Sequence, residues 1–149
     1  TALRLAQAKA RAVAPDCPAA LIIGCDQVAV IDGVSLGKPD NHDNAVAQLR
    51  AMRGRSVLFH TALTLFNART GVSQTAEVPT TVRFRHYGDA EIERYLEVER
   101  PYDCAGSARI EGLGIVLVES VHSIDPTALI GLPLMQLAAM LRNEGVAVV

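Results

Sequence analysis

An apolar strand that carries an acid near its end, in residues 21–28, constrains this chain more than any other segment. The acid is Asp26, which stands two residues after Gly24, and the tripeptide Gly37-Lys38-Pro39 follows a short distance further along. A carboxylate at the end of a buried strand costs free energy unless it has a partner or a function. An acid and a glycine-flanked lysine close together in the sequence therefore indicate a site for a charged ligand, and phosphate is the ligand that this pairing favours.

The order of apolar patterns predicts a mixed α/β or α+β domain. Ala, Leu, Lys and Arg make residues 2–14 a helix that Pro15 ends, and residues 20–31 are expected to form a strand. Asp32-Gly33 is a turn signal, so the segments on either side of it are expected to pair as a short hairpin. The remaining expected elements are a helix over 43–52, strands over 56–66 and 72–84, a helix over 89–98, a strand over 115–118, and a last helix opened by Leu132-Pro133.

Composition and charge exclude several classes of protein. The chain has 149 residues, half of them hydrophobic, which is enough for one domain with a core. Its net charge of −2 provides no basic field, so neither nucleic acid nor an anionic membrane surface is expected as a partner. Cys17, Cys25 and Cys104 are odd in number and too widely spaced for a disulfide framework or a zinc site. A reduced, cytoplasmic setting is the interpretation that follows, and no apolar run is long enough to cross a membrane.

Each candidate functional residue also has a purely structural interpretation. Asp26 is either a buried acid that caps a turn or pairs with an arginine, or an acid that binds a divalent cation, accepts a proton from water, or does both. Lys38 is either a solvated loop lysine or a point charge on a phosphate, held in a stiff loop by Pro39. Lys9 lies on the polar side of the first expected helix, where solvation is the default. Gln27 could simply complete a backbone hydrogen bond near the strand end.

Several well-known catalytic patterns are absent from the sequence. There is no G-x-x-x-x-G-K-[ST] loop and no G-x-G-x-x-G after a strand, which removes P-loop and Rossmann interpretations. There is no G-x-S-x-G elbow to support a serine hydrolase. The four histidines form no pair at metal-ligand spacing and are interpreted as structural.

Taken together, short segments spread over the chain resemble the Maf family of nucleotide pyrophosphatases. The resemblance covers essentially the whole chain, and its strength lies in the collinear order of segments that are each weak alone. Within the family the chain is most similar to the 7-methyl-GTP pyrophosphatase subgroup, to which Gln27, Cys104 and Glu111 point. The matching segments are residues 5–10, 22–28, 37–39, 45–55, 82–85, 91–92 with Tyr95, 104–107, 110–114 and 125–134.

The resemblance implies a fold and a chemistry. The fold would be the mixed α/β architecture shared with the inosine-triphosphate pyrophosphatases, with flanking helices and a cleft between two lobes. The activity would be hydrolysis of 7-methyl-GTP to 7-methyl-GMP and pyrophosphate. Asp26 is implied as the catalytic proton acceptor, Lys9 and Lys38 as catalytic cations that stabilise phosphate charge, and Gln27 and Glu111 as substrate-specificity residues. A divalent cation, Mg²⁺ or Mn²⁺, is the implied cofactor, with Asp26 as a metal ligand; members are cytoplasmic and often homodimeric.

Two departures from the family pattern bear on these expectations. Cys25 stands where the family has Ser or Ala before the acid, a small change that is expected to be tolerated. The sequence opens at Thr1, so a single Maf-like domain over residues 1–149 is expected to lack the family's N-terminal strand and its Ser-x-Ser-Pro-Arg-Arg-like phosphate-binding loop. Two alternatives stay open: a house-cleaning pyrophosphatase for another modified or pyrimidine nucleotide of the dTTP/UTP type, and a truncated, non-catalytic nucleotide-binding protein.

Overall fold

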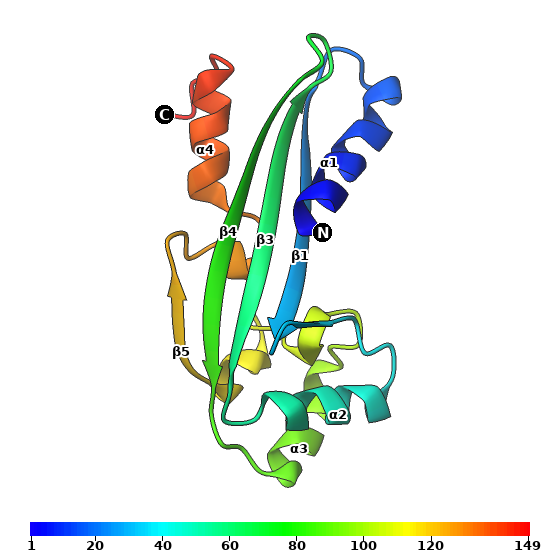
Figure 1. Cartoon of the computed structure of the whole chain (residues 1–149), viewed down its shortest axis with the longest axis vertical. Helices are drawn as coiled ribbons and strands as arrows, with labels where there is room; N and C mark the ends of the chain where they lie inside the picture. The colour runs from blue at the N-terminus through cyan, green and yellow to red at the C-terminus, as the bar shows by residue number, and fades with distance from the viewer. The chain divides into compact units, whose positions relative to one another are not determined.

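The computed structural model describes residues 1–149, which form the mixed α/β architecture that the sequence predicts. Five strands make one antiparallel sheet in the order β2-β1-β3-β4-β5. Figure 1 labels β1, β3, β4 and β5. The strands are β1 (Leu21–Ile31), β2 (Val34–Leu36), β3 (Ser56–Asn67), β4 (Val72–Phe84) and β5 (Val118–Ser123). The α-helices are α1 (Ala2–Val13), α2 (His42–Met52), α3 (Asp89–Glu99) and α4 (Leu134–Asn143), and short 3₁₀ helices are η1 (Ala14–Asp16), η2 (Ala105–Ser107), η3 (Leu113–Leu117) and η4 (Ala128–Ile130).

Local sequence signals account for most of these elements. The expected hairpin is confirmed, because β1 and β2 pair antiparallel with Ile31 opposite Val34. The two turn residues, Asp32 and Gly33, both have positive φ angles (50° and 78°), as a tight hairpin turn requires. The side chain of Asn41 accepts a hydrogen bond from the backbone N–H of Asn44 at 2.9 Å and so caps α2.

One predicted element is wrong. The sequence predicts a strand over residues 115–118, whereas the structure has η3 over Leu113–Leu117 and begins β5 only at Val118. A short apolar run has no periodicity that separates a strand from a turn of helix, so the pattern alone could not decide between them.

Residues group into two compact units, and β1, β3, β4 and β5 contribute residues to both. Unit 1 comprises residues 1–27, 60–79 and 123–149, and unit 2 comprises residues 28–59 and 80–122. The assignment of residues 1–149 to a single Maf-like domain stays a prediction.

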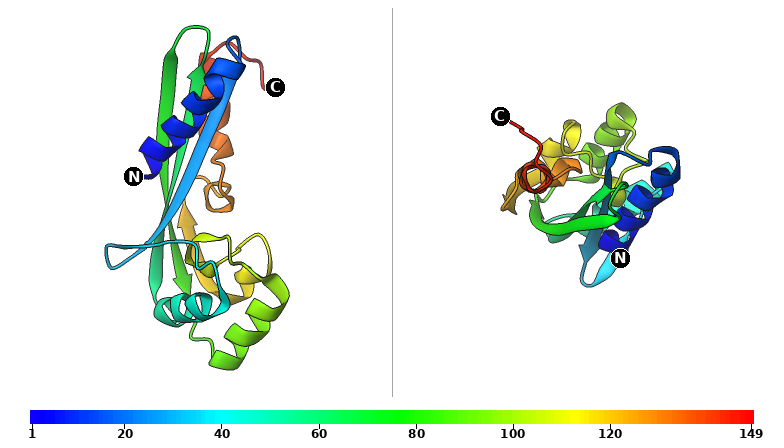
Figure 2. Two further views of the ribbon diagram at one scale, coloured as in Figure 1. Left: turned by 90° about the vertical axis from the view of Figure 1, so that its right-hand side faces the viewer. Right: turned by 90° about the horizontal axis from the view of Figure 1, so that it is seen from above.

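In unit 1, two apolar clusters lie on opposite faces of the sheet, because successive side chains of a strand point to opposite sides. Phe66 and Ile22 pack with Ala10 of α1. The neighbour of Phe66 on β3, Leu65, packs instead with Leu137 of α4. α1 and α4 therefore cover opposite faces of the sheet in unit 1, an arrangement that can be followed in Figures 1 and 2.

In unit 2, the core forms where α2 packs against α3 and η2. Leu49 and Met52 of α2 are fully buried, as are Ile92 and Leu96 of α3. The hydroxyl of the buried Tyr87 donates to the carbonyl of Leu49 at 2.7 Å, so its polar atom is satisfied within the core. None of the chain's helices combines the length and the apolar character needed to span a bilayer.

Candidate active site

Asp26 and Lys9 form an ion pair in unit 1. Asp26 lies on β1 and Lys9 on α1, and the ammonium nitrogen Nζ donates to Asp26 Oδ1 at 2.7 Å. The same nitrogen donates to the backbone carbonyl of Cys25 at 3.2 Å. The Asp26 side chain is 14% exposed and that of Lys9 is 58% exposed. A largely buried carboxylate is thus held in one orientation by a cation that reaches solvent.

Each partner of this pair keeps one group unused. An ammonium has three N–H donors, and two of those of Lys9 are directed at Asp26 and at the carbonyl of Cys25. The second carboxylate oxygen, Asp26 Oδ2, has no hydrogen-bond partner in the structure. The fully buried polar atoms without a partner lie elsewhere, in Arg53 and Thr64. A free acceptor beside a free cationic donor can hold a water molecule next to a phosphate oxygen.

The absence of a side chain at Gly24 allows α1 to approach β1 closely. A Cβ atom at this position would lie 2.1 Å from the carbonyl oxygen of Ala6 and 2.9 Å from Cβ of Ala10. Ala6 and Ala10 are themselves fully buried, so small residues line both sides of the contact. This close approach brings Lys9, on the same helix, within reach of the carboxylate two residues after the glycine.

Cys25 and Gln27 flank Asp26 and are engaged on the other face of the sheet. The Cys25 thiol lies 2.7 Å from the carbonyl oxygen of Gly131 and 2.9 Å from that of Ala62. Burial raises the pKa of this thiol, so it stays protonated and serves as a donor.

Three acceptors surround the side-chain amide nitrogen of Gln27. They are Thr61 Oγ1 at 2.9 Å and the carbonyl oxygens of Ala128 and Leu129, both at 3.1 Å. Since an amide nitrogen carries two protons, its donor capacity is fully used inside unit 1. This matches the structural interpretation of Gln27, and its role in substrate specificity stays a prediction.

Asp125 is a buried acid that the sequence analysis did not identify as a site residue. Its Oδ1 accepts from the backbone N–H of Thr127 at 3.0 Å and from the hydroxyl of the same residue at 2.6 Å. Its Oδ2 accepts from the backbone N–H of Met135 at 2.9 Å, at the N-terminus of α4. Burial opposes ionisation, but these hydrogen bonds outweigh it and lower the pKa of Asp125. Two sequence signals point to this residue, the Asp-Pro-Thr turn and its place in a segment that resembles the Maf family, and neither of them identifies its role.

Lys38 lies in the loop after β2, in unit 2, and is exposed. The preceding carbonyl, that of Gly37, accepts from Gln48 Nε2 at 2.9 Å and from the backbone N–H of Gly106 at 3.2 Å. Pro39 is buried, and its carbonyl accepts from Asn44. The loop is therefore pinned on both sides of the lysine, as the Gly-Lys-Pro sequence predicts.

Glu111 also belongs to unit 2 and is exposed in a tightly folded loop. The backbone N–H groups of Gly112 and Gly114 both donate to the carbonyl of Arg109. A Cβ atom at Gly114 would lie 2.4 Å from that carbonyl oxygen, so the loop requires glycine there. Arg109 in turn pairs with Glu99 at 3.1 Å, which fixes the base of the loop.

Unit 1 thus brings Lys9 and Asp26 into contact, and it also contains Gln27, whose side chain is bound on the other face of the sheet. The other two, Lys38 and Glu111, are presented to solvent from loops of unit 2. Their catalytic and specificity roles stay predictions.

Asp26 is not surrounded by a cluster of metal-ligating side chains. No three His, Cys, Asp or Glu residues of the chain are grouped to hold a metal ion. Asp26 offers one carboxylate, and one of its oxygens already accepts from the ammonium of Lys9. Mg²⁺ is commonly held by one or two carboxylates together with substrate phosphates, so a bound nucleotide would have to supply most of the ligands.

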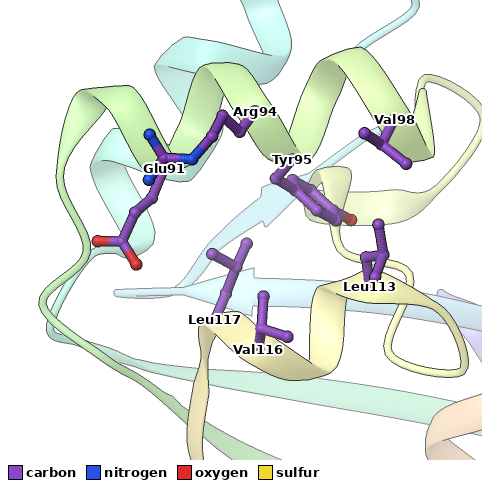
Figure 3. A pocket seen from close by; sticks show the side chains of 7 residues that line it. All are labelled: Glu91, Arg94, Tyr95, Val98, Leu113, Val116 and Leu117. Atoms are coloured by element: carbon purple, nitrogen blue, oxygen red, sulfur yellow. The ribbon is translucent and has the colours of Figure 1, made fainter.

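A cavity of about 290 Å³ opens between α3 and η3 in unit 2 (Figure 3). Its floor is apolar, with Glu91 and Arg94 also in its lining, and none of the predicted site residues lines it. Burial raises the pKa of Tyr95 to about 12, so its hydroxyl stays protonated and donates to the carbonyl of Ser107 at 3.0 Å. The lining residues are Glu91, Arg94, Tyr95, Val98, Leu113, Val116 and Leu117.

Comparison with known proteins identifies the family to which the chain belongs. The sequence profile described as "Maf-like protein" matches residues 1–144. A protein of Methylobacillus flagellatus named 7-methyl-GTP pyrophosphatase is 60% identical over 149 residues, which is 100% of this chain and 78% of that protein. Proteins of the same name from Paraburkholderia xenovorans and Thiobacillus denitrificans are 61% and 58% identical, over 97% and 99% of this chain and 72% and 74% of their own lengths.

Proposed function

Since this chain belongs to the Maf family, we propose that it is a hydrolase of nucleotide metabolism that converts 7-methyl-GTP and water to 7-methyl-GMP and pyrophosphate. The observation that carries the proposal is the Lys9–Asp26 pair, a carboxylate with one free oxygen beside an exposed ammonium. The relatives at 58–61% identity that are named 7-methyl-GTP pyrophosphatase support the choice of nucleotide.

In the proposed reaction, a water molecule attacks the α-phosphorus and pyrophosphate leaves. Asp26 Oδ2 orients this water and takes its proton, while Lys9 keeps Asp26 Oδ1 in place. The remaining N–H donor of Lys9 stabilises negative charge on a phosphate oxygen. We assign Lys38 as a further cation for the phosphates, on the family resemblance. Phosphoryl chemistry depends mainly on such positioning and charge neutralisation.

We expect a divalent cation to accompany the nucleotide instead of residing in the protein. A single carboxylate shared with a lysine is a poor metal site, and nucleotide phosphates are strong ligands for Mg²⁺. Chelation with EDTA is therefore expected to abolish pyrophosphate release, and excess Mg²⁺ or Mn²⁺ to restore it. Calorimetry of the nucleotide-free protein should show no tight Mg²⁺ binding. Turnover that EDTA leaves unchanged would contradict the cation requirement.

Glu111 is proposed to select the base. Guanine presents adjacent N–H donors on its Watson–Crick edge, and one carboxylate can accept two of them. Methylation at N7 makes the base cationic, which adds charge complementarity that glutamine lacks. Glu111→Gln is expected to lower the selectivity for 7-methyl-GTP over UTP by about 10-fold, equivalent to about 1.4 kcal/mol.

The ratio of kcat/KM for the two nucleotides measures this effect. Glu97→Gln is the matched control. Glu97 is an exposed glutamate of α3 in the same unit, so its substitution makes the same chemical change at a different place. An unchanged ratio in Glu111→Gln would remove the proposed role of the carboxylate.

A nucleotide panel tests the function itself. Pyrophosphate release is measured with 7-methyl-GTP, GTP, UTP and dTTP as substrates. Preferential release from 7-methyl-GTP supports the proposal, whereas preferential hydrolysis of UTP and dTTP would indicate the pyrimidine type of house-cleaning enzyme. Calorimetric binding of nucleotides without turnover would indicate a non-catalytic binding protein.

A cytoplasmic location and a homodimer are proposed on the family resemblance alone. Sedimentation velocity tests the second, since a homodimer has twice the 15.9 kDa mass of the chain.

A further inference from the structure

We propose that Asp125 and the turn that follows it, residues 125–131 (the η4 turn), position Asp26 for catalysis by holding the two residues beside it. The proposal rests on the proposed function of Asp26 as the proton acceptor. It makes Gln27 a positioning residue that acts through the strand, in place of the substrate-specificity role that the family resemblance implies.

Asp125 anchors the η4 turn. Its side chain has no exposed surface, and its two oxygens accept from Thr127 on one side and from the backbone of Met135 on the other. The hydroxyl of Thr127 also accepts from the backbone N–H of Leu134 at 2.8 Å. The turn is thereby fastened to the first residues of α4, which packs on β3 through Leu137.

The η4 turn also holds β1 at two residues, Cys25 and Gln27. The carbonyl of Gly131 lies 2.7 Å from the Cys25 thiol, and the carbonyls of Ala128 and Leu129 accept from Gln27. Thr61 of β3 completes the contact on the Gln27 side, because its hydroxyl accepts from the Gln27 amide and donates to the carbonyl of Ala128 at 2.9 Å.

Strand geometry separates this contact from the reacting group. Side chains alternate along β1, so Gly24 and Asp26 face α1 while Cys25 and Gln27 face the η4 turn. A water bound to Asp26 lies on the α1 face, opposite the amide of Gln27. With both of its neighbours fixed, the backbone of Asp26 has little freedom to move its carboxylate relative to the reacting phosphorus.

Gln27→Met tests the proposal, because methionine has a similar size and no donor. A displacement of about 1 Å can cost on the order of 10²-fold in rate, so kcat is expected to fall by about 10-fold. The KM for nucleotide is expected to stay within about 2-fold of the wild-type value, since a positioning residue does not touch the substrate. The loss should be the same for 7-methyl-GTP and GTP, which differ only in the methyl group at N7 and the positive charge that it gives the base.

Thr61→Val provides a second, milder variant in case Gln27→Met does not fold. It removes one hydroxyl from the same contact at nearly constant volume, and Thr61→Ser is expected to recover most of the lost turnover. Thr64→Val is the matched control, because Thr64 lies buried on the same strand and its hydroxyl has no hydrogen-bond partner. Thr64→Val is expected to leave kcat unchanged.

Two results would overturn the proposal. One is wild-type kcat in folded Gln27→Met and Thr61→Val proteins. The other is a changed ratio of 7-methyl-GTP to GTP hydrolysis in Gln27→Met, which would show that Gln27 contacts the base. The carboxyl ¹³C resonance of Asp26 gives a readout that needs no turnover. A shift in Thr61→Val but not in Thr64→Val supports positioning even if the wild-type protein hydrolyses no nucleotide, in which case the proposed function alone fails.

Discussion

Asp26→Asn is expected to lower kcat for 7-methyl-GTP by about 10²- to 10⁴-fold, the range typical of a lost general base. Asparagine keeps the shape of the side chain but cannot take a proton from water. Lys9 would lose its charged partner while keeping a carbonyl-type acceptor, so the contact between α1 and β1 should survive. The rate of pyrophosphate release measures the loss, and calorimetry tests whether nucleotide binding persists.

Asp16→Asn is the control for this experiment. Asp16 is an exposed aspartate of η1 in the same unit, so the substitution makes the same chemical change away from the site. Its turnover is expected to match the wild-type rate. Wild-type turnover in Asp26→Asn would instead exclude the carboxylate as proton acceptor and, with it, the mechanism proposed above.

Gly24→Ala is expected to have the largest effect on stability. The added Cβ would lie 2.1 Å from the carbonyl oxygen of Ala6, and because this oxygen belongs to the helix backbone it cannot rotate away. Overpacking of this kind costs about 1–3 kcal/mol or more. The helix must move off the strand to relieve the contact, which withdraws Lys9 from Asp26. Turnover is therefore expected to fall even at temperatures where the variant remains folded.

Urea denaturation followed by circular dichroism measures the change in the free energy of unfolding. Gly37→Ala serves as the stability control, since no atom lies within 4 Å of a Cβ at Gly37 and its backbone needs no positive φ. That variant is expected to unfold within about 0.5 kcal/mol of the wild type. Equal stability of Gly24→Ala and Gly37→Ala would mean that α1 does not pack on β1 as described.

The sequence predicted the parts of the fold that depend on local signals. The helix ended by Pro15, the hairpin at Asp32-Gly33 and the helix expected over 43–52 each follow from a few neighbouring residues, and all three are confirmed. The strand expected over residues 115–118 is wrong, because an apolar run of that length fits a 3₁₀ helix equally well.

The candidate site was predictable only in part, because most of its contacts are not local in the sequence. Asp26 is conspicuous within its apolar strand, whereas composition places Lys9 on a solvated helix face, and only the family resemblance singled it out. The contacts around Asp26 join residues that lie far apart in the sequence, such as Cys25 with Gly131 and Gln27 with Ala128. No periodicity or spacing rule reports contacts of that separation, so the role inferred for Asp125 could come only from the structure.

The alternation along β1 has a consequence for how this protein tolerates change over evolutionary time. Residues 24–27 of β1 are contacted from both sides of the sheet. Substitutions at Ala6 or Ala10 of α1 act on them from one side, and substitutions at the η4 turn act on them from the other. Their effects on turnover should therefore be non-additive in a double-mutant cycle. Related proteins that carry substitutions at Ala6 or Ala10 are therefore expected to carry compensating substitutions at the η4 turn. The two sets of positions should covary although the sheet separates them.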